Sequence, residues 1–474
     1  MQYGGEIISE ELRFAPSVQN HSTYAFRKVS PQGVSTQIAL SASSQVGPTE
    51  VIIPPSVFNF SKSRINFQLE LPDPGATVKA NWVDANALSM IGRMVVYDSN
   101  TNAVLLDCSN LEKYAALVVP AATKYDEFKT KATSWASTTY AQTLPILGDT
   151  AAGSSQPFPS EDIQKSNSLI NVSHLNTVAA GTTAFNSFEG RRYLLVGADS
   201  EKSFWDVSIP LAAFKLTVLS VNKNLYSPSN LVMQIYWNSV DNFAWTSTSL
   251  TNPTSGTAAS VGSTNVFINN FSLQLANEQN LAIISKIQQQ VVSTGISIPI
   301  AYPTITRQVL AAATAQSYQL NISKGYGSRI LAFITAPFGH DNAAINARNS
   351  HIRGTLTTYN TFLNNIAEKY QAGYDARLAQ DFYYGNREYL EGSVIQNLGE
   401  YAVAEWVHIS SYFGEKPLHM VDQTEIDGYD VGSTASAWQL QANFSGAPAA
   451  GTTWITCIIG QKLLTLSANG TMVQ

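Results

Sequence analysis

Residues 64–71, RINFQLEL, alternate between apolar and polar side chains along almost their whole length. Successive side chains of an extended chain point to opposite sides. One side of this segment is apolar and consists of Ile65, Phe67, Leu69 and Leu71. The other side is polar and consists of Asn66, Gln68 and Glu70. This pattern predicts a β-strand with one face in a core and the other toward solvent.

The same alternation recurs along the chain. It is found in residues 205–209, 231–237, 271–275, 318–322 and 438–444. Strands with one apolar and one polar face are typical of antiparallel sheets, whereas parallel sheets are usually buried on both faces. We therefore predict an all-β fold with few helices.

Helix patterns are few. Ser109, Asn110, Leu111 and Glu112 form a Ser-x-x-Glu capping box, which predicts a helix start, and Pro120 is expected to end that helix. Asn277 can cap a second helix between two blocks of strands. Its predicted apolar face consists of Leu281, Ile284, Ile287 and Val291. Residues 386–405 predict one further helix or two shorter ones.

Two stretches without regular periodicity interrupt the strands, at residues 120–190 and about 337–354. A loop of about 70 residues in a compact protein indicates a functional excursion. Each stretch follows two similar strand segments, 64–71 and 92–97 in the first half and 317–322 and 328–333 in the second. About eight strands in each half predict two-sheet sandwiches, and eight strands in two Greek keys form a jelly roll.

The composition is unusually poor in charge. Only 13% of the 474 residues are Asp, Glu, Lys or Arg, against about 25% in typical soluble proteins. Such a neutral surface suggests extensive contact with other protein or exposure to harsh solvent, and a secreted β protein with a Ser/Thr-rich exterior is the alternative. The net charge is −6, and Arg13, Arg27 and Lys28 are the only cations near the N-terminus. We therefore expect no direct nucleic-acid binding, which needs many cations.

Cys108 and Cys457 stand in apolar surroundings and are interpreted as small core residues rather than as a disulfide framework. Residues 1–6 lack the pattern of a signal peptide. No apolar stretch reaches the roughly 18 residues of a membrane-spanning helix. The protein is therefore expected to be synthesised and soluble inside a cell.

Several longer segments share their order of elements and their general residue pattern with one family of viral proteins. They are residues 11–31 (an arm and first strand), 50–72 (an extended segment and strand), 89–118 (a hairpin and short helix), 267–287 (a last strand and connecting helix), 366–402 (a strand and helix) and 438–470 (a closing hairpin). In this order the chain resembles the double jelly-roll major capsid proteins, the lineage of the adenovirus hexon, the tectivirus coat and the virophage and polinton-like virus coats. The resemblance covers most of the chain.

The resemblance implies two tandem eight-stranded antiparallel jelly rolls, a few short helices and long surface loops. The expected divisions are an N-terminal arm (1–30), a first jelly roll (31–276, with a long loop at about 120–190), a connecting helix (277–293) and a second jelly roll (294–474). It also implies a homotrimer of pseudo-hexagonal outline that tiles an icosahedral shell, with residues 120–190 as an outer tower. Expected partners are further copies, neighbouring capsomers, minor capsid and vertex (penton) proteins and, as a candidate, an internal membrane. The expected location is the virion.

No catalytic, cofactor or metal residue is predicted. His340, Asp341 and His351 form a weak nucleophile candidate, and a solvated loop is the favoured interpretation. Asp422, Glu425, Asp427 and Asp430 supply oxygen ligands of the kind that Ca²⁺ prefers, but their spacing is not that of an EF-hand. Trp135 and Trp245 could belong to a sugar-binding face, although core or interface positions are favoured.

Two other functions stay open. A viral spike or attachment protein that binds host glycans would also fit a β-sandwich with a Ser/Thr-rich loop. A β-sandwich glycoside hydrolase would need two carboxylates about 5–10 Å apart, which the sequence cannot pair. We favour the capsid protein and expect no enzymatic activity.

Overall fold

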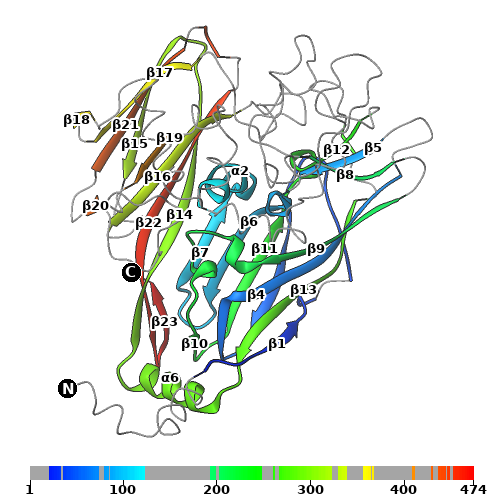
Figure 1. The fold of residues 1–474 in the computed structure, drawn as a ribbon, viewed down its shortest axis with the longest axis vertical. Coiled ribbons are helices and arrows are strands. Elements are labelled where there is room, and N and C mark those ends of the chain that lie inside the picture. The colour runs from blue at the N-terminus through cyan, green and yellow to red at the C-terminus, as the bar shows by residue number, and fades with distance from the viewer. Residues whose placement is uncertain are drawn as a thin grey trace, which may run out of the picture.

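The strands of the first half form a sandwich of two main antiparallel sheets (Figure 1). The computed structural model describes residues 21–33, 36–73, 80–84, 86–122, 193–198, 202–247, 260–261, 266–322, 329–338, 356–363, 366–367, 408–411, 429–430, 436–444, 446–448 and 452–473. The first sheet has the order β1-β13-β4-β10, with β2 paired to β13 and β9 to β4. Its strands are β1 (Tyr24–Val29), β2 (Gln37–Ala39), β4 (Ser56–Leu71), β9 (Ser203–Pro210), β10 (Leu225–Ser227) and β13 (Phe267–Glu278).

The facing sheet has the order β3-β11-β6-β7. Its strands are β3 (Val46–Ile53), β6 (Ile91–Asp98), β7 (Val104–Ser109) and β11 (Leu231–Trp237). Lettered B to I along the chain, with β1 and β2 as B and β9 and β10 as G, the two sheets read B-I-D-G and C-H-E-F. This is the strand order of an eight-stranded jelly roll.

The second half repeats this order. One sheet has the order β14-β22-β16-β19, with β20 paired to β16 and β23 to β22, and the other has the order β15-β21-β17-β18. With β14 as strand B, the sheets again read B-I-D-G and C-H-E-F. The strands are β14 (Ile296–Val309), β15 (Ala315–Ile322), β16 (Arg329–Phe338), β17 (Leu356–Leu363), β18 (Ile366–Ala367), β19 (His408–Ser411), β20 (Tyr429–Asp430), β21 (Ser436–Phe444), β22 (Thr453–Ser467) and β23 (Gly470–Val473). The predicted fold class, two tandem antiparallel jelly rolls, is confirmed.

Shorter elements complete the described chain. A third, small sheet has the order β12-β5-β8, and four 3₁₀ turns and two α-helices lie between the strands. These elements are β5 (Ala80–Asp84), β8 (Tyr193–Ala198), β12 (Ala244–Ser247), η2 (Ala87–Met90), η6 (Leu211–Ala213), η7 (Val218–Ser220), η8 (Val240–Asn242), α2 (Leu111–Ala121) and α6 (Leu281–Ser293). Neither described helix is long and apolar enough to cross a bilayer.

The core of the first roll lies between its two sheets. Trp237 of β11 is fully buried, and its ring meets Phe67 of β4 and Phe271 of β13 edge-on, at centroid distances of 5.1 and 5.5 Å. Its indole Nε1 donates to Thr49 Oγ1 at 2.9 Å, so the polar atom of the ring is satisfied. Aromatic pairs in this geometry add to the stability gained by burial alone.

The alternation predicted for β4 is confirmed with one exception. Ile65, Phe67, Leu69 and Leu71 are buried, as expected. Glu70 was predicted on the solvent face but is only 6% exposed. It accepts hydrogen bonds from Lys202 Nζ at 2.6 Å and Asn269 Nδ2 at 2.8 Å. These partners come from neighbouring strands and loops, which the pattern of a single strand does not reveal.

The predicted capping box at Ser109 is wrong. Ser109 is the last residue of β7 and is paired with Arg93, so Asn110 becomes the N-cap of α2. Asn110 has φ 55°, which Asn tolerates better than most residues, and its side chain makes no cap hydrogen bond. Glu112 instead accepts from Asn238 Nδ2 at 3.2 Å. Pro120 lies in the last turn, and α2 ends one residue beyond it.

The connecting helix is confirmed, but its predicted cap is wrong. Asn277 belongs to β13, and Asn280 is the N-cap of α6, with its Oδ1 accepting from Ala282 N at 3.0 Å. Leu281, predicted on the buried face, is 76% exposed, and the one fully buried residue of α6 is Val291. Because the helix starts later than expected, Leu281 stands at its exposed first position.

The predicted equivalence of strand segments between the two halves is also wrong. Residues 64–71 and 92–97 belong to β4 and β6, which are strands D and E of the first roll. Residues 317–322 and 328–333 fall on β15 and β16, which are strands C and D of the second roll. Short alternating segments look alike wherever they stand in a sandwich, so only the pairing of strands identifies their equivalents.

Other predictions fall partly or wholly outside the described residues. These are most of the arm (1–30), of the long loop (120–190) and of the stretch 337–354, and the whole helical region 386–405. Within the range predicted as an arm, β1 pairs along its whole length with β13, so its six residues belong to the first sheet.

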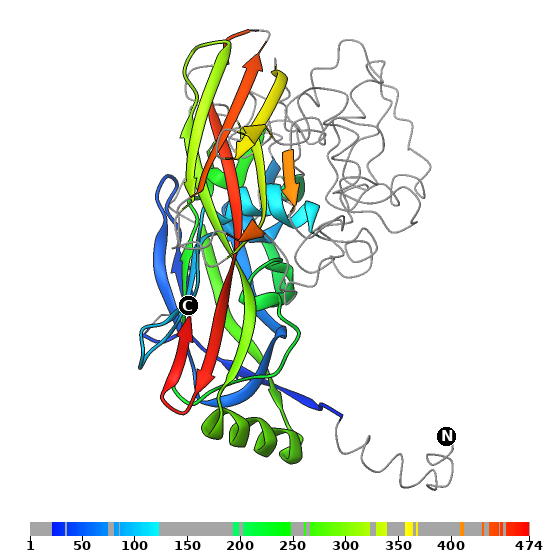
Figure 2. The same ribbon diagram turned by 90° about the vertical axis from the view of Figure 1, so that its left-hand side faces the viewer.

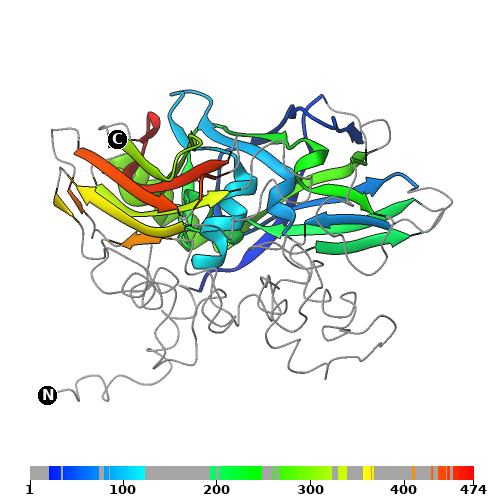
Figure 3. The same cartoon turned by 90° about the horizontal axis from the view of Figure 1, so that it is seen from above.

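The two rolls share one hydrophobic core. A single cluster of buried residues includes Trp237 and Leu273 of the first roll and Ile300, Ile334 and Ile459 of the second. Figure 3 shows the rolls side by side with α2 between them, and α2 packs against β6 of the first roll and against β16 and β22 of the second. At the far end, α6 lies across the ends of the strands (Figure 2).

Candidate assembly site at the junction of the two rolls

A turn of the first roll holds the last hairpin of the second. Asp98 ends β6 and is fully buried, and its Oδ2 accepts from the backbone amide of Thr471 at 3.0 Å and from Ser229 Oγ at 2.5 Å. Its Oδ1 accepts from the amides of Asn100 and Thr101 at 2.8 and 3.2 Å. Four donors therefore satisfy one buried carboxylate.

These contacts determine the charge of Asp98. Burial would raise the pKa of this carboxyl, but the hydrogen bonds from Ser229, Asn100, Thr471 and Thr101 together lower it below its ordinary value. Asp98 is thus a carboxylate near neutral pH. A buried charge of this kind is stable only while its donors stay in place.

Further bonds fix the hairpin between β22 and β23 to the same turn. Thr101 Oγ1 donates to the carbonyl of Thr471 at 2.6 Å, and Asn100 Nδ2 donates to the carbonyl of Asn469 at 3.3 Å. Gly470 between them has φ 116°, and a Cβ there would lie 2.7 Å from Thr101 Cγ2. A side chain at position 470 would therefore separate the hairpin from the turn.

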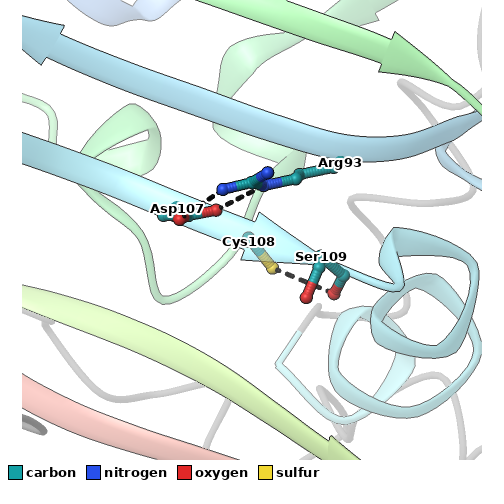
Figure 4. Close-up of polar contacts among 4 residues, drawn as sticks. All are labelled: Arg93, Asp107, Cys108 and Ser109. Carbon is teal, nitrogen blue, oxygen red and sulfur yellow. Dashed lines mark hydrogen bonds and ion pairs between the residues drawn. The ribbon is translucent and has the colours of Figure 1, made fainter. Parts of the chain in front are cut away.

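A second contact region joins β7 to β14 and β23. Arg93 and Asp107 form a bidentate ion pair on neighbouring strands, with Nε and Nη2 each 2.8 Å from a carboxylate oxygen (Figure 4). This hydrogen-bonded carboxylate raises the pKa of Arg93. In the second roll, Lys462 Nζ lies 3.9 Å from the ring centre of Tyr302. Burial first, and then the charge of Asp107, raise the pKa of Tyr302 to about 12.

Both cysteines are buried thiols, as predicted, and neither forms a disulfide. Cys108 stands on β7, next to Asp107 (Figure 4), and Cys457 stands on β22. Burial raises the pKa of both thiols. Cys108 and Cys457 belong to the shared core, so their contribution is packing rather than reactivity.

Exposed apolar side chains are candidates for contacts between copies. In the described part of the chain they are Phe26, Val104, Phe204, Leu281, Val292, Val309, Leu463 and Met472. Leu463 and Met472 lie diagonally across β22 and β23, because Met472 is opposite Thr465 in the ladder. Leu281 and Val292 both lie on α6.

Most residues of the sequence-derived candidate sites lie outside the part of the chain that the structure describes. His340, Asp341, His351, Asp422, Glu425, Asp427 and Trp135 lie outside the described residues. Asp430 lies in β20, opposite Arg329. Trp245 is fully buried in β12, as its core interpretation predicted, and is not on a sugar-binding face. Within the described ranges no three His, Cys, Asp or Glu side chains are grouped to hold a metal ion.

The junction around Asp98 was not identified from the sequence. Its only sequence signal is a pair of turn-forming segments, DSNTN at 98–102 and SANG at 467–470. Such residues predict turns in any protein. Nothing in their pattern shows that two turns about 370 residues apart meet.

Comparison with solved structures matches nearly the whole chain. The Faustovirus major capsid protein matches with TM-score 0.49 and 9% identity, over 94% of this chain and 90% of that one. The mavirus major capsid protein matches with TM-score 0.46 and 12% identity, over 95% and 90%. A chain of the Sputnik virophage structure matches with TM-score 0.48 and 11% identity, over 96% and 90%.

The predicted double jelly-roll fold is confirmed by the strand order of this chain. The fold assignment itself rests on the strand order within each roll, which is read from this chain alone. No protein-family model matches the sequence, and no curated protein matches it either.

Proposed function

We propose that this chain is a major capsid protein whose homotrimers form pseudo-hexagonal capsomers that tile an icosahedral virus shell. The observation that carries the proposal is the tandem repeat of one strand order, B-I-D-G facing C-H-E-F, in a single polypeptide. Three copies then supply six similar units. A closed threefold arrangement can thus present six similar sides to its neighbours.

The junction supports this role because a capsomer needs its two rolls in a fixed relation. The rolls share one core, and the turn at Asp98 is bonded to the hairpin at Thr471. A flexible linker between two separate domains would leave the outline of a trimer variable. Here the linker is α6, which packs against strands of both rolls.

The low charge supports extensive contact with other protein. With 13% charged residues, the chain has little of the charged surface that keeps a monomer soluble. We propose as partners further copies of the chain, neighbouring capsomers, and minor capsid and vertex proteins, with an internal membrane as a candidate. The proposed location is the virion, and the proposed role includes neither catalysis nor nucleic-acid binding.

The proposed domain division follows the sequence prediction. It consists of the N-terminal arm (1–30), the first jelly roll (31–276), the connecting helix (277–293) and the second jelly roll (294–474). Since β1 pairs with β13, the proposed arm includes six residues that belong to the sheet.

The test is the mass of the purified protein by light scattering, followed by negative-stain imaging. A mass near three times 51.4 kDa, with hexagonal particles, is expected. A monomer at high concentration, together with strong and selective binding on a glycan array, would instead favour the attachment protein. Aspartate substitutions at the exposed apolar positions outside α6, made one at a time, would identify the trimer contact by the loss of the trimer mass.

A further inference from the structure

The end of the molecule around α6 carries an apolar stripe. Leu281 and Val292 are 76% and 61% exposed. They are eleven residues apart, which at about 100° per residue places them within about 20° of each other around the helix. Ile284 and Gln288, on the adjoining side, are half-buried. Leu281 and Val292 therefore lie next to the face of α6 that packs against the strands. These two exposed side chains are candidates for one contact along this side of α6.

The same end of the molecule is basic. Within residues 21–33, 56–64, 98–104, 218–230, 271–299 and 461–473 the only carboxylates are Asp98 and Glu278, which are buried, at 0% and 3% exposed. The exposed cations in these ranges are Arg27, Lys28, Lys62, Lys223 and Lys286. Among the described residues none of these five forms an ion pair. A partner for this end should therefore combine apolar side chains with negative charge.

Glu278 fixes the point at which the first described residues leave the fold. Its Oε1 accepts from the amides of Thr23 and Asn280 at 2.8 and 3.0 Å, and its Oε2 accepts from Asn224 Nδ2 at 2.9 Å. Asn280 Nδ2 donates to the carbonyl of His21 at 3.1 Å. The chain before His21 therefore starts beside the first turn of α6, next to Leu281.

The sequence of residues 1–20 has the complementary chemistry. It contains Ile7, Ile8, Leu12 and Phe14 together with three carboxylates, Glu6, Glu10 and Glu11, against the single cation Arg13. The thirteen residue-to-residue steps from Ile8 to His21 can span up to about 45 Å, whereas the thirteen residues of α6 are about 20 Å long. Attachment at His21 also gives the segment a high effective concentration at α6.

We propose that residues 1–20 pack in the same copy against the Leu281–Val292 stripe of α6, with their carboxylates near the surrounding cations. This contact goes beyond the proposed function, because it needs only one chain and is measurable whether or not trimers form. It gives the acidic N-terminal segment a defined place at the α6 end.

The test is cross-linking in the full chain. Ile8→Cys is combined either with Val292→Cys or with Gln290→Cys and treated with a short bis-maleimide. Both α6 positions are exposed and stand two residues apart, so they lie about 160° apart around the helix. A flexible segment without a preferred contact would reach positions 290 and 292 equally. The native thiols Cys108 and Cys457 are buried and do not compete.

The expected result is an intramolecular product at least about fivefold more abundant with Val292→Cys than with Gln290→Cys, unchanged on dilution. Replacing Glu6, Glu10 and Glu11 by Gln should reduce that product about threefold, as for the loss of exposed charge pairs. Equal yields at the two positions, no effect of the Gln substitutions, or a product between two chains would overturn the proposal. The proposal would also be overturned if the protein co-sedimented with anionic phosphatidylserine vesicles and lost the cross-link. Residues 1–20 would then bind lipid.

Discussion

The carboxylate of Asp98 accepts a hydrogen bond from the backbone amide of Thr471 at 3.0 Å, across 373 positions of sequence. This contact joins the end of strand E in the first roll to the last hairpin of the second. Both atoms are buried, so water cannot replace either one if the other is lost. The relation between the rolls can therefore be tested by single substitutions at this place.

Asp98→Asn should destabilise the protein by about 1–3 kcal/mol. The N–H groups of the new amide would face the four N–H and O–H groups that donate to the Asp98 carboxylate. Chemical denaturation measures the change in free energy of unfolding. Asp206→Asn is the control, since Asp206 is exposed and accepts one bond, from Gln68 Nε2 at 2.8 Å. Its effect should stay within about 0.5 kcal/mol. Equal effects of the two substitutions would contradict a structural role for the junction.

Gly470→Ala should destabilise the protein by roughly 1–3 kcal/mol, because the new Cβ has both a positive φ and a close neighbour, Thr101. Gly33→Ala is the matched control. Gly33 has φ 62°, but a Cβ there meets no atom within 4 Å, so only the conformational cost of about 1 kcal/mol remains. Thermal unfolding of the two variants distinguishes the backbone strain of a positive φ from a steric clash of the new Cβ. A smaller destabilisation at position 470 than at position 33 would refute the close packing of the hairpin.

Acid should weaken the fold. Hydrogen bonding to Lys202 and Asn269 lowers the pKa of Glu70, while in Asp98 and Glu278 the hydrogen bonds outweigh the opposite effect of burial. A carboxyl with a lowered pKa in the folded state stabilises the protein fully above its ordinary pKa, 3.8 for Asp and 4.5 for Glu. This stability is lost as the pH falls through the lower folded-state value.

The free energy of unfolding, measured in denaturant, should thus be nearly constant from pH 7 to about 5 and decrease below about 4.5. The double variant Asp98→Asn with Glu278→Gln should start less stable and show a shallower decrease. An identical slope in the variant and the natural protein would show that these two carboxyls do not carry the acid response.

Asn280→Ala should destabilise the fold by about 0.5–2 kcal/mol and increase hydrogen exchange in the first turn of α6, since the cap of Ala282 N is lost. Asn277→Ala is the comparison, because Asn277 is the cap that the sequence predicts but lies in β13. It should leave exchange in α6 nearly unchanged. The reverse result would restore the original prediction.

The strands were largely predictable because alternation is a local property. Residues 65–71, 231–237 and 271–275 all form strands with the expected inner face, since burial of one side requires this period. The local pattern fails at Ser109 and Glu70, where contacts with a neighbouring strand or side chain determine the structure. Ser109 stays in β7 because its ladder with β6 continues, and Glu70 is buried because Lys202 and Asn269 reach it.

By itself the sequence determined the class of the fold, the tandem repeat of two strand-rich halves with a helix between them, and the burial of both cysteines. Period-two alternation, residue volume and charge content are sufficient for these conclusions, because each is a property of short segments or of composition. Only the tertiary structure decided which strands are equivalent in the two rolls, that Asp98 and Thr471 meet, and that Leu281 is exposed beside the start of the described chain. These features depend on pairings between residues hundreds of positions apart, and the free energy of such contacts belongs to the pair and leaves no pattern in either segment alone.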